Sequence, residues 1–408
     1  VFYICPTMPK ISKKGNAVPA SPIRKLAPYA DQAKKNGIHI YHLNIGQPDI
    51  ETPPQFWDAI KNFSNKVLEY APSDGFVDIK EKYAAFFFFF YGLKHIQPAD
   101  LVITTGGSEA LMYTLFSILD AEDEIIIPEP LYANYIGFAK SGDINVRPIP
   151  TTFENNFALP SIDEFEKCIN ERTKAILVCN PNNPTGYTYS YEELMRLKEI
   201  VLKHDLFLIG DEVYREFIYG DQKNYHSVLS FPELEQHAIL IDSLSKRYSA
   251  CGARIGMVAT KNKEVIQSVL KFAQQRLSPP TLGQIGAGAV FETVGADFFN
   301  NMKEEYRRRR DTLVEGLNNI EGVKCHIPGG AFYCIVQLPV ENSDDFCQWM
   351  LSDFNYENAT VMMAPASGFY ATPGMGKKEV RIAYVLNVDN LKKAIKCIEE
   401  GLKAYKNK

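Results

Sequence analysis

Hydrophobic positions from about residue 100 onward gather in short unbroken runs rather than in alternation with polar positions. Unbroken runs of Ile, Val and Leu indicate strands that are buried on both faces. Segments with helical spacing lie between the runs, such as "SEALMYTLFSILD" and "SYEELMRLKEIVLKHD". This succession predicts a mostly parallel sheet within an α/β layer. The runs are "LVITTGG", "DEIIIPEP", "AILVCNP", "LFLIGDEVY", "HAILIDSLS" and "RIGMVAT".

The same pattern divides the chain into three parts. Residues 1–45 are rich in Pro and Lys and predict an arm with one short helix, in "PIRKLAPYADQAKKNG", which ends at Gly37. Residues 46–295 hold the predicted sheet and form a large domain. Residues 296–408 begin with a charged helical stretch and continue with the strands "AFYCIVQL" and "EVRIAYV" and a closing helix. They predict a smaller α/β C-terminal domain, to which part of the arm is added.

Composition narrows the range of functions. The net charge of the 408 residues is −5 and no long basic run occurs, which argues against a nucleic-acid-binding surface. No stretch reaches the roughly 20 apolar residues needed to span a bilayer, so no membrane segment is expected. The longest aromatic block, Phe86 to Phe90, is expected to lie on a buried helix.

Eight cysteines are present, and none of them forms a C-x-x-C pair. Several lie inside apolar runs, as Cys179 does in "AILVCNP", which indicates reduced, buried thiols rather than a disulfide framework. No signal peptide is recognisable, and the expected location is therefore the cytoplasm. Residues 1–7, which precede Met8, are expected to be an extension or a tag remnant.

Polar residues follow the apolar runs at the point where each predicted strand ends. Ligands of open α/β sheets collect at the carboxyl ends of the strands, so these residues are expected to share one site. Together they offer an anion cradle, an aromatic ring, an amide, a carboxylate, a phenol and an amine, which suit a phosphorylated heteroaromatic aldehyde. The residues are Gly106, Gly107, Ser108, Glu129, Tyr132, Asn180, Asn183, Asp211, Tyr214, Ser243, Ser245 and Lys246.

Two strings shape this edge. "TTGGSEAL" predicts a strand, a glycine turn and a helix start at Ser108, where free N–H groups would attract an anion. An ordinary helix cap is the alternative interpretation. A hydrolase elbow is excluded because Ala110 stands where that motif needs glycine. "NPNNPTG" forces a turning path directly after a buried strand and places an Asn amide there.

Three charged residues need partners. Asp211 at the end of a buried strand is costly unless a positive group, such as a protonated pyridine nitrogen, neutralises it. A nucleotide-hydrolase role for Asp211 would need a phosphate loop, which "GMGKK" near Lys377 does not supply. Lys246 follows a strand between serines and suits a nucleophilic amine, with a solvated surface lysine as the alternative. Arg381, inside an apolar strand, suits a carboxylate clamp.

The order of several uncommon strings resembles the class I pyridoxal-phosphate aminotransferases of fold type I, from about Ile23 to the C-terminus. The strings are "YHLNIGQPD", "YAPSDG", "TTGGSEAL", "PEPLYANY", "NPNNPTG", "GDEVY", "SLSKRYSACGARIG" and "VRIAYV".

The resemblance implies pyridoxal 5'-phosphate as cofactor and a role for each matching position. Lys246 would bond to the cofactor's aldehyde and later carry a proton to and from the Cα of the amino acid. Asp211 would keep the pyridine nitrogen protonated. Asn183 and Tyr214 would bond to the ring's phenolic oxygen, and Tyr132 would stack on the ring. No metal is implied.

The resemblance also implies binding groups for the phosphate and the substrate. Tyr70 would reach the phosphate of a neighbouring subunit, which implies a homodimer with shared sites. Arg381 would bind the α-carboxylate of the substrate, helped by Gly46 and Asn183. The phosphate would be surrounded by Gly107, Ser108, Ser243, Ser245 and Arg254.

The expected reaction is amino-group transfer between an L-amino acid and a 2-oxo acid, with aspartate and 2-oxoglutarate as the first pair. Aromatic or alanine aminotransferase activity, and β-elimination or decarboxylation, remain alternatives. A non-catalytic sensor would need a DNA-binding module, and no helix-turn-helix pattern is present. A dehydrogenase would rest on "GAGAVF", which follows no strand and lacks the third glycine. The group that binds the distal end of the substrate is left open among Arg215, Lys13, Lys14, His42 and Tyr132.

Overall fold

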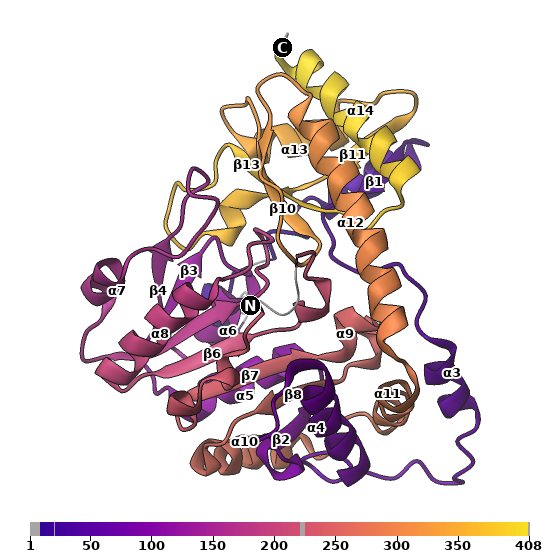
Figure 1. The fold of residues 1–408 in the computed structure, drawn as a ribbon. Coiled ribbons are helices and arrows are strands. Elements are labelled where there is room, and N and C mark those ends of the chain that lie inside the picture. Colours follow the sequence, from indigo (N-terminus) through magenta and orange to yellow (C-terminus); the bar gives the residue numbers. More distant parts are fainter. Residues whose placement is uncertain (1–8, 20, 221–224, 407–408) are drawn as a thin grey trace, which may run out of the picture.

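A seven-stranded sheet forms the centre of the larger part of this computed structural model, which describes residues 9–19, 21–220 and 225–406 (Figure 1). All neighbouring strands are parallel except β8, which runs antiparallel to both of its neighbours. The predicted α/β class and mostly parallel sheet are therefore confirmed. In spatial order the strands are β2 (Leu101–Thr104), β8 (Gly256–Ala259), β7 (Ala238–Ser243), β6 (Phe207–Asp211), β5 (Thr173–Cys179), β3 (Glu124–Glu129) and β4 (Asn145–Pro150).

The edge strand β4 was not predicted from the sequence. Its residues "NVRPIP" include one Arg and two Pro and are mostly half-buried. Pro cannot donate to a neighbouring strand and is tolerated at a sheet edge. The six apolar runs, by contrast, all form strands, and every residue of β7 is buried.

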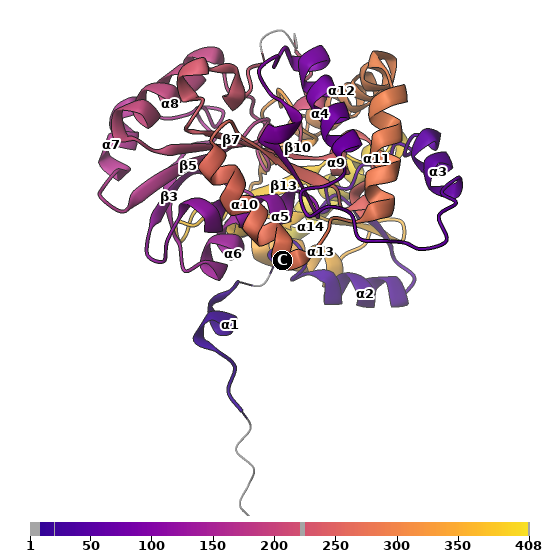
Figure 2. The same cartoon turned by 90° about the horizontal axis from the view of Figure 1, so that it is seen from below.

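Helices cover both faces of the large sheet, which explains why its central strands are apolar throughout. Helices α7 and α8 lie on one side, and α5, α6 and α10 lie on the other (Figure 2). Inside α11, the string "GAGAVF" is helical, which removes the dinucleotide-binding alternative. The helices of this part are α3 (Pro54–Lys61), α4 (Val77–Tyr91), α5 (Gly107–Ile118), α6 (Asn134–Ser141), α7 (Ile162–Cys168), α8 (Tyr191–His204), α9 (Leu244–Arg247), α10 (Lys263–Arg276) and α11 (Thr281–Thr293).

A four-stranded antiparallel sheet forms the centre of the second part, which stands above the large sheet in Figure 1. A separate parallel pair joins β1 to β11, so a strand from the N-terminal segment lies beside one from the last fifty residues. In order, the four strands are β12 (Ala364–Pro365), β13 (Glu379–Ala383), β10 (Tyr333–Gln337) and β9 (Lys324–Cys325), and the pair is β1 (His39–His42) with β11 (Ala359–Met362).

The long helix α12 rises from the large sheet to the second part (Figure 1). It begins at Ala296, which is the predicted start of the small domain. Strand β1 of the N-terminal segment pairs with β11 in the second part, where part of the arm was expected. The domain limits themselves stay a prediction. At the periphery, α1 is held by an ion pair of 2.6 Å between Lys14 and Asp143. The remaining helices are α1 (Lys13–Ala17), α2 (Ala27–Lys35), α12 (Ala296–Asn318), α13 (Ser343–Ser352) and α14 (Val388–Lys406).

The aromatic block is only partly buried. It lies on α4, as predicted, and Phe86 and Phe87 are in the core. Phe88, Phe89 and Phe90 are exposed to 42%, 77% and 37%. Five successive helical residues turn through more than a full circle, so they cannot all face the core.

Two expectations from composition can be compared with the described residues. Their seven cysteines are unpaired, and most of them are buried; Cys5, like the expected extension 1–7, lies outside the described part. None of the helices within that part is long and apolar enough to cross a membrane.

Candidate active site

A cavity of about 550 Å³ lies between the carboxyl edge of the large sheet and the small sheet. Most of the predicted site residues line it. Tyr70 does not, and of the residues expected at the strand ends Gly106, Glu129 and Asn180 are not among the lining residues. Glu129 instead accepts from the Ala371 and Thr372 N–H groups, and Asn180 accepts from the Tyr189 N–H. The predicted residues that line the cavity come from the last residues of β6 and β7, from the segments that follow β1, β2, β3, β5, β6 and β7, and from β13 across the cavity. The lining residues that the sequence predicted are Gly46, Gly107, Ser108, Tyr132, Asn183, Asp211, Tyr214, Ser243, Ser245, Lys246, Arg254 and Arg381.

Lys246 brings a primary amine into this cavity. It lies in α9, a single turn that begins directly after β7 and is capped by Ser243, whose Oγ accepts from the Ser245 N–H. The Lys246 Nζ donates to the Gly46 carbonyl at 3.0 Å. Burial lowers the pKa of this amine below that of a free lysine, and the Cys251 thiol opposes the shift.

Asp211 supplies the negative group on the floor of the cavity. Its Oδ2 accepts from the Tyr135 hydroxyl at 2.6 Å. Its Oδ1 is buried without a well-formed hydrogen bond in the described part of the chain. Burial raises the pKa of Asp211 from 3.8 to about 6, although the bonds from Tyr135 and the Val213 N–H lower it. A cationic N–H at Oδ1 would relieve this cost.

The first turn of α5 forms an anion cradle. Gly106 is the N-cap residue and has no side chain to cap the helix, and Ser108 is the second helical residue. Ser108 is therefore not the ordinary cap that was the alternative interpretation. Arg254 closes the cradle, where its guanidinium donates to the carbonyls of Cys251 and Thr105 at 3.0 and 3.4 Å. A helix start beside a guanidinium suits a phosphate group.

Arg381 lies opposite the cradle on β13 and is 1% exposed. It donates to the Asn183 Oδ1 at 3.3 Å and to the Asn44 carbonyl, and the rings of Tyr333 and Phe369 flank it at 4.7 and 4.9 Å. No carboxylate pairs with it within the residues that the structure describes. A buried guanidinium without a carboxylate suits the carboxylate of a ligand.

Tyr333 is a cavity residue that the sequence interpretation missed. Its hydroxyl lies 3.1 Å from that of Tyr214 and donates to the Gly46 carbonyl at 3.5 Å. A Cβ on Gly46 would lie 1.7 Å from this hydroxyl, so the approach requires glycine. The string "AFYCIVQL" gave no signal for a site, because it reads as an ordinary core strand.

A free cation also enters the cavity from the N-terminal arm. Arg24 lines it together with Ser21 and Asn134. The Arg24 side chain has no hydrogen-bond or ion-pair partner within the described part of the chain. Sequence reasoning missed Arg24, because the arm does not follow a strand of the predicted sheet.

Most of the candidates for the distal group lie elsewhere. Arg215 is fully buried among carboxylates, and Lys14 pairs with Asp143 on the surface. Lys13 and His42 are not among the cavity residues, whereas Tyr132 is. Arg215 was therefore a wrong candidate for binding the distal end of the substrate. The sequence alone does not show whether a charged residue is buried in ion pairs.

Tyr70 lies away from the cavity and is 78% exposed. It lines a second hollow of about 530 Å³, together with Asn62, Phe63 and Thr281. The predicted contact of Tyr70 with the phosphate of a neighbouring subunit stays a prediction, because the structure contains one chain.

The cavity fits the cofactor that the resemblance implies. The cradle at α5 matches a phosphate, the unsatisfied Asp211 Oδ1 matches a protonated ring nitrogen, and Lys246 matches an aldehyde. These three groups differ in chemistry and line one space, as a single ligand with three such functions requires.

Comparisons with known proteins agree with this arrangement. Residues 38–398 match the model for the family described as "Aminotransferase class I and II". An aspartate aminotransferase of Bacillus subtilis is 31% identical over 406 residues, covering 97% of this chain and 100% of that protein. The structure of Thermus thermophilus aspartate aminotransferase with maleate has a TM-score of 0.86 at 27% identity, and covers 97% of this chain and 100% of its own. The alanine aminotransferase from Pyrococcus furiosus has a TM-score of 0.87 at 29% identity, with the same coverage. The chain thus belongs to the aminotransferase class I and II family.

Proposed function

We propose that this aminotransferase uses pyridoxal 5'-phosphate to move an amino group between an L-amino acid and a 2-oxo acid, with aspartate and 2-oxoglutarate as the first pair. One observation carries the proposal. The Lys246 amine, the unsatisfied Asp211 Oδ1 and the Arg381 guanidinium, which has no carboxylate partner among the described residues, line one cavity. The names of the similar aspartate aminotransferases support the choice of aspartate.

Each part of the cofactor would have a partner among the cavity residues. Ser108, Ser245 and Arg254 would hold the phosphate, with Gly107 and Ser243 beside them, and Asp211 would face the ring nitrogen. Tyr132 would lie against the ring face, and Asn183 and Tyr214 would donate to its phenolic oxygen. When bound, pyridoxal phosphate supplies an aldehyde that condenses with amines and a ring that accepts the electron pair left at Cα.

Lys246 is proposed to hold and move the proton. Its lowered pKa leaves a larger neutral fraction near neutral pH than a free lysine has, and only the neutral amine can take a proton from Cα. The Gly46 carbonyl, which accepts from Nζ, would orient the amine during this exchange.

Arg381 and Arg24 are proposed to hold the two ends of a dicarboxylate. The planar fork of Arg381 would bind the α-carboxylate and so fix the direction of Cα. The unpaired Arg24 would bind the distal carboxylate of aspartate or 2-oxoglutarate. Alanine has no such carboxylate, so Arg24 favours dicarboxylates over the substrate named for the Pyrococcus relative.

We further propose a homodimer and a cytoplasmic location. Trp57, Leu68 and Tyr70 are exposed to 51%, 59% and 78%. Apolar side chains of this size suit coverage by a second copy, in which Tyr70 would reach the partner's phosphate site. The unpaired cysteines of the described residues suit a reducing compartment.

The test combines spectroscopy with covalent labelling. Purified protein mixed with pyridoxal phosphate should absorb visible light, and aspartate should shift this band. In a separate sample without aspartate, borohydride reduction should attach a pyridoxyl group to Lys246, as peptide mass spectrometry would show, and the Lys246→Ala protein should take up none. Equal yields of oxaloacetate and glutamate from aspartate and 2-oxoglutarate support transfer. Release of ammonia or carbon dioxide instead would favour elimination or decarboxylation.

A further inference from the structure

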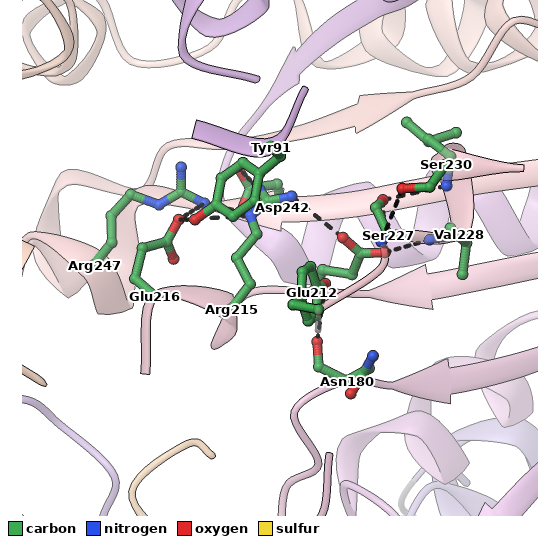
Figure 3. A network of polar contacts seen from close by, with 12 residues as sticks. Tyr91, Asn180, Glu212, Arg215, Glu216, Ser227, Val228, Ser230, Asp242 and Arg247 are labelled. Atoms are coloured by element: carbon green, nitrogen blue, oxygen red, sulfur yellow. Dashed lines mark hydrogen bonds and ion pairs between the residues drawn. The ribbon is translucent and has the colours of Figure 1, made fainter. Parts of the chain in front are cut away.

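A group of buried charges lies close to the cavity without lining it. We call it the charged core cluster; its side chains are at most 2% exposed, and none of them lines the cavity (Figure 3). A carboxylate or guanidinium placed this deep is costly unless it is paired. The members of the charged core cluster are Glu212, Arg215, Glu216, Asp242 and Arg247.

Residues of the cavity and of the charged core cluster are neighbours in sequence. Three residues that line the cavity are each followed directly by a member of the charged core cluster. The same short backbone therefore carries one side chain to the cavity and the next to the cluster. Fixing the second side chain therefore restricts the direction of the first. The three pairs are Asp211 with Glu212, Tyr214 with Arg215, and Lys246 with Arg247.

The contacts of Arg247 hold both ends of α9. Arg247 is the last residue of this single turn, and it donates to Asp242, the residue just before the N-cap Ser243. Its guanidinium also lies 3.4 Å from Glu216 Oε1 and 4.9 Å from the Phe86 ring centre. A one-turn helix has little stability of its own, so these contacts determine how α9 is oriented.

Other members hold the partners of Arg247 in place. Arg215 Nη2 lies 2.8 Å from Asp242 Oδ2, so the two arginines grip different oxygens of one carboxylate. The Tyr91 hydroxyl donates to Glu216 at 2.8 Å. Buried ion networks seldom add much net stability, because desolvation offsets the attraction between the charges. Fixed geometry next to the cavity is a better explanation for this one.

We propose that Arg247 is a positioning residue for Lys246: through Asp242 and Glu216 it fixes α9 so that the Lys246 amine points to the Gly46 carbonyl and the cavity. The inference rests on the proposed role of Lys246. It assigns no contact with cofactor or substrate to Arg247.

Arg247→Met and Arg247→Lys separate geometry from charge. Methionine keeps much of the volume, and lysine keeps the charge but loses the planar fork. The matched control is Arg172→Met, because Arg172 pairs at 2.8 Å with the buried Glu124 at the far ends of the strands. Circular dichroism and urea unfolding would establish that each variant is folded.

The first readout is the reactivity of Lys246 in the cofactor-free protein. Trace acetylation over a range of pH, followed by peptide mass spectrometry, gives the labelling midpoint of this amine. Both Arg247 variants should shift the midpoint toward that of surface lysines, whereas Arg172→Met should leave it unchanged. If both folded Arg247 variants label Lys246 with the wild-type pH profile, the inference is overturned. If Arg247→Met does not fold, the labelling profile of Arg247→Lys alone decides whether Arg247 positions Lys246.

The second readout is the split between kcat and KM in the loaded enzyme. Misplacement of the amine should lower kcat about 10- to 100-fold, with Arg247→Lys less affected than Arg247→Met. KM for the amino acid should change by less than about threefold, because Arg381 is untouched. If the wild-type protein transfers no amino group, the proposed function fails, while the labelling still decides the role of Arg247.

Discussion

The phenolic oxygens of Tyr214 and Tyr333 lie 3.1 Å apart, one at the end of the large sheet and the other at the start of β10 in the small sheet. The Tyr333 hydroxyl also donates to the Gly46 carbonyl, which accepts from Lys246. This pair of hydroxyls therefore connects the two sheets across the cavity, within reach of the reactive amine.

Removing either hydroxyl should weaken the same interaction. We expect Tyr333→Phe to lower kcat/KM about 10-fold, which corresponds to the loss of one hydrogen bond. Tyr214→Phe should lower kcat/KM by at least the same factor, since Tyr214 is also proposed to bind the cofactor. The loss of transition-state stabilisation in the double variant, calculated from kcat/KM, should be about 1 kcal/mol smaller than the sum of the two single losses. The reason is that both single changes break the same contact. Strictly additive losses would show that the pair does not act together.

The raised pKa of Asp211 has a consequence for stability that can be measured without cofactor. The folded protein holds this proton more tightly than the unfolded chain does, so the contribution of Asp211 to stability falls as pH rises from about 4 to about 6 and is then level. A shift from 3.8 to about 6 is equivalent to about 3 kcal/mol. Cofactor-free Asp211→Asn should therefore be more stable than wild type at pH 7, by up to that amount.

Urea unfolding at pH 4, 5, 6 and 7 tests this expectation. The difference between Asp211→Asn and wild type should shrink toward pH 4. In the presence of pyridoxal phosphate the order should reverse, because the variant loses the charge that faces the ring nitrogen. A wild-type protein whose stability rises from pH 4 to pH 6 relative to the variant would contradict the raised pKa.

Arg24 should determine the preference for dicarboxylates. Arg24→Met should raise KM for aspartate and for 2-oxoglutarate about 10- to 100-fold, the usual cost of losing hydrogen bonds to a charged group. KM for alanine should stay unchanged, because alanine has no distal carboxylate. Lys25→Met is the control, since Lys25 pairs with Asp344 and does not line the cavity. Equal effects on aspartate and alanine would remove Arg24 from the distal site.

Gly106 should be required for phosphate binding. Its φ of 78° and ψ of 170° lie in a region that only glycine adopts readily, and an added Cβ would lie 2.3 Å from Arg254 Nη2. Gly106→Ala should destabilise the protein by about 1–3 kcal/mol through backbone strain. It should also displace Arg254 and weaken cofactor binding, as fluorescence titration with pyridoxal phosphate would show. Gly137→Ala, with no atom within 4 Å of the added Cβ, is the control.

The sequence predicted the large sheet well, because buried parallel strands are apolar throughout and polar residues follow them. It placed Lys246, Asp211 and Asn183 at one edge for the same reason. Edge strand β4 escaped detection because proline and arginine break its apolar pattern.

Features that depend on distant contacts could not be predicted. Arg24 reaches the cavity from the arm, and Tyr333 reaches it from the small sheet, so neither follows a strand of the large sheet. The burial of Arg215 depends on carboxylates that come from two different strand ends. The resemblance supplied roles for residues such as Arg254, which spacing alone did not assign.

The place of Arg381 on β13 has a consequence during protein synthesis. Only α14 follows β13 among the described elements, and Arg381 is the last of the cavity residues along the chain, so the proposed α-carboxylate clamp leaves the ribosome after the others. A nascent or prematurely terminated polypeptide that already displays Lys246 would still lack the group that is proposed to orient an amino acid. The proposed reactive amine is thus made about 135 residues before the guanidinium proposed to select its substrate.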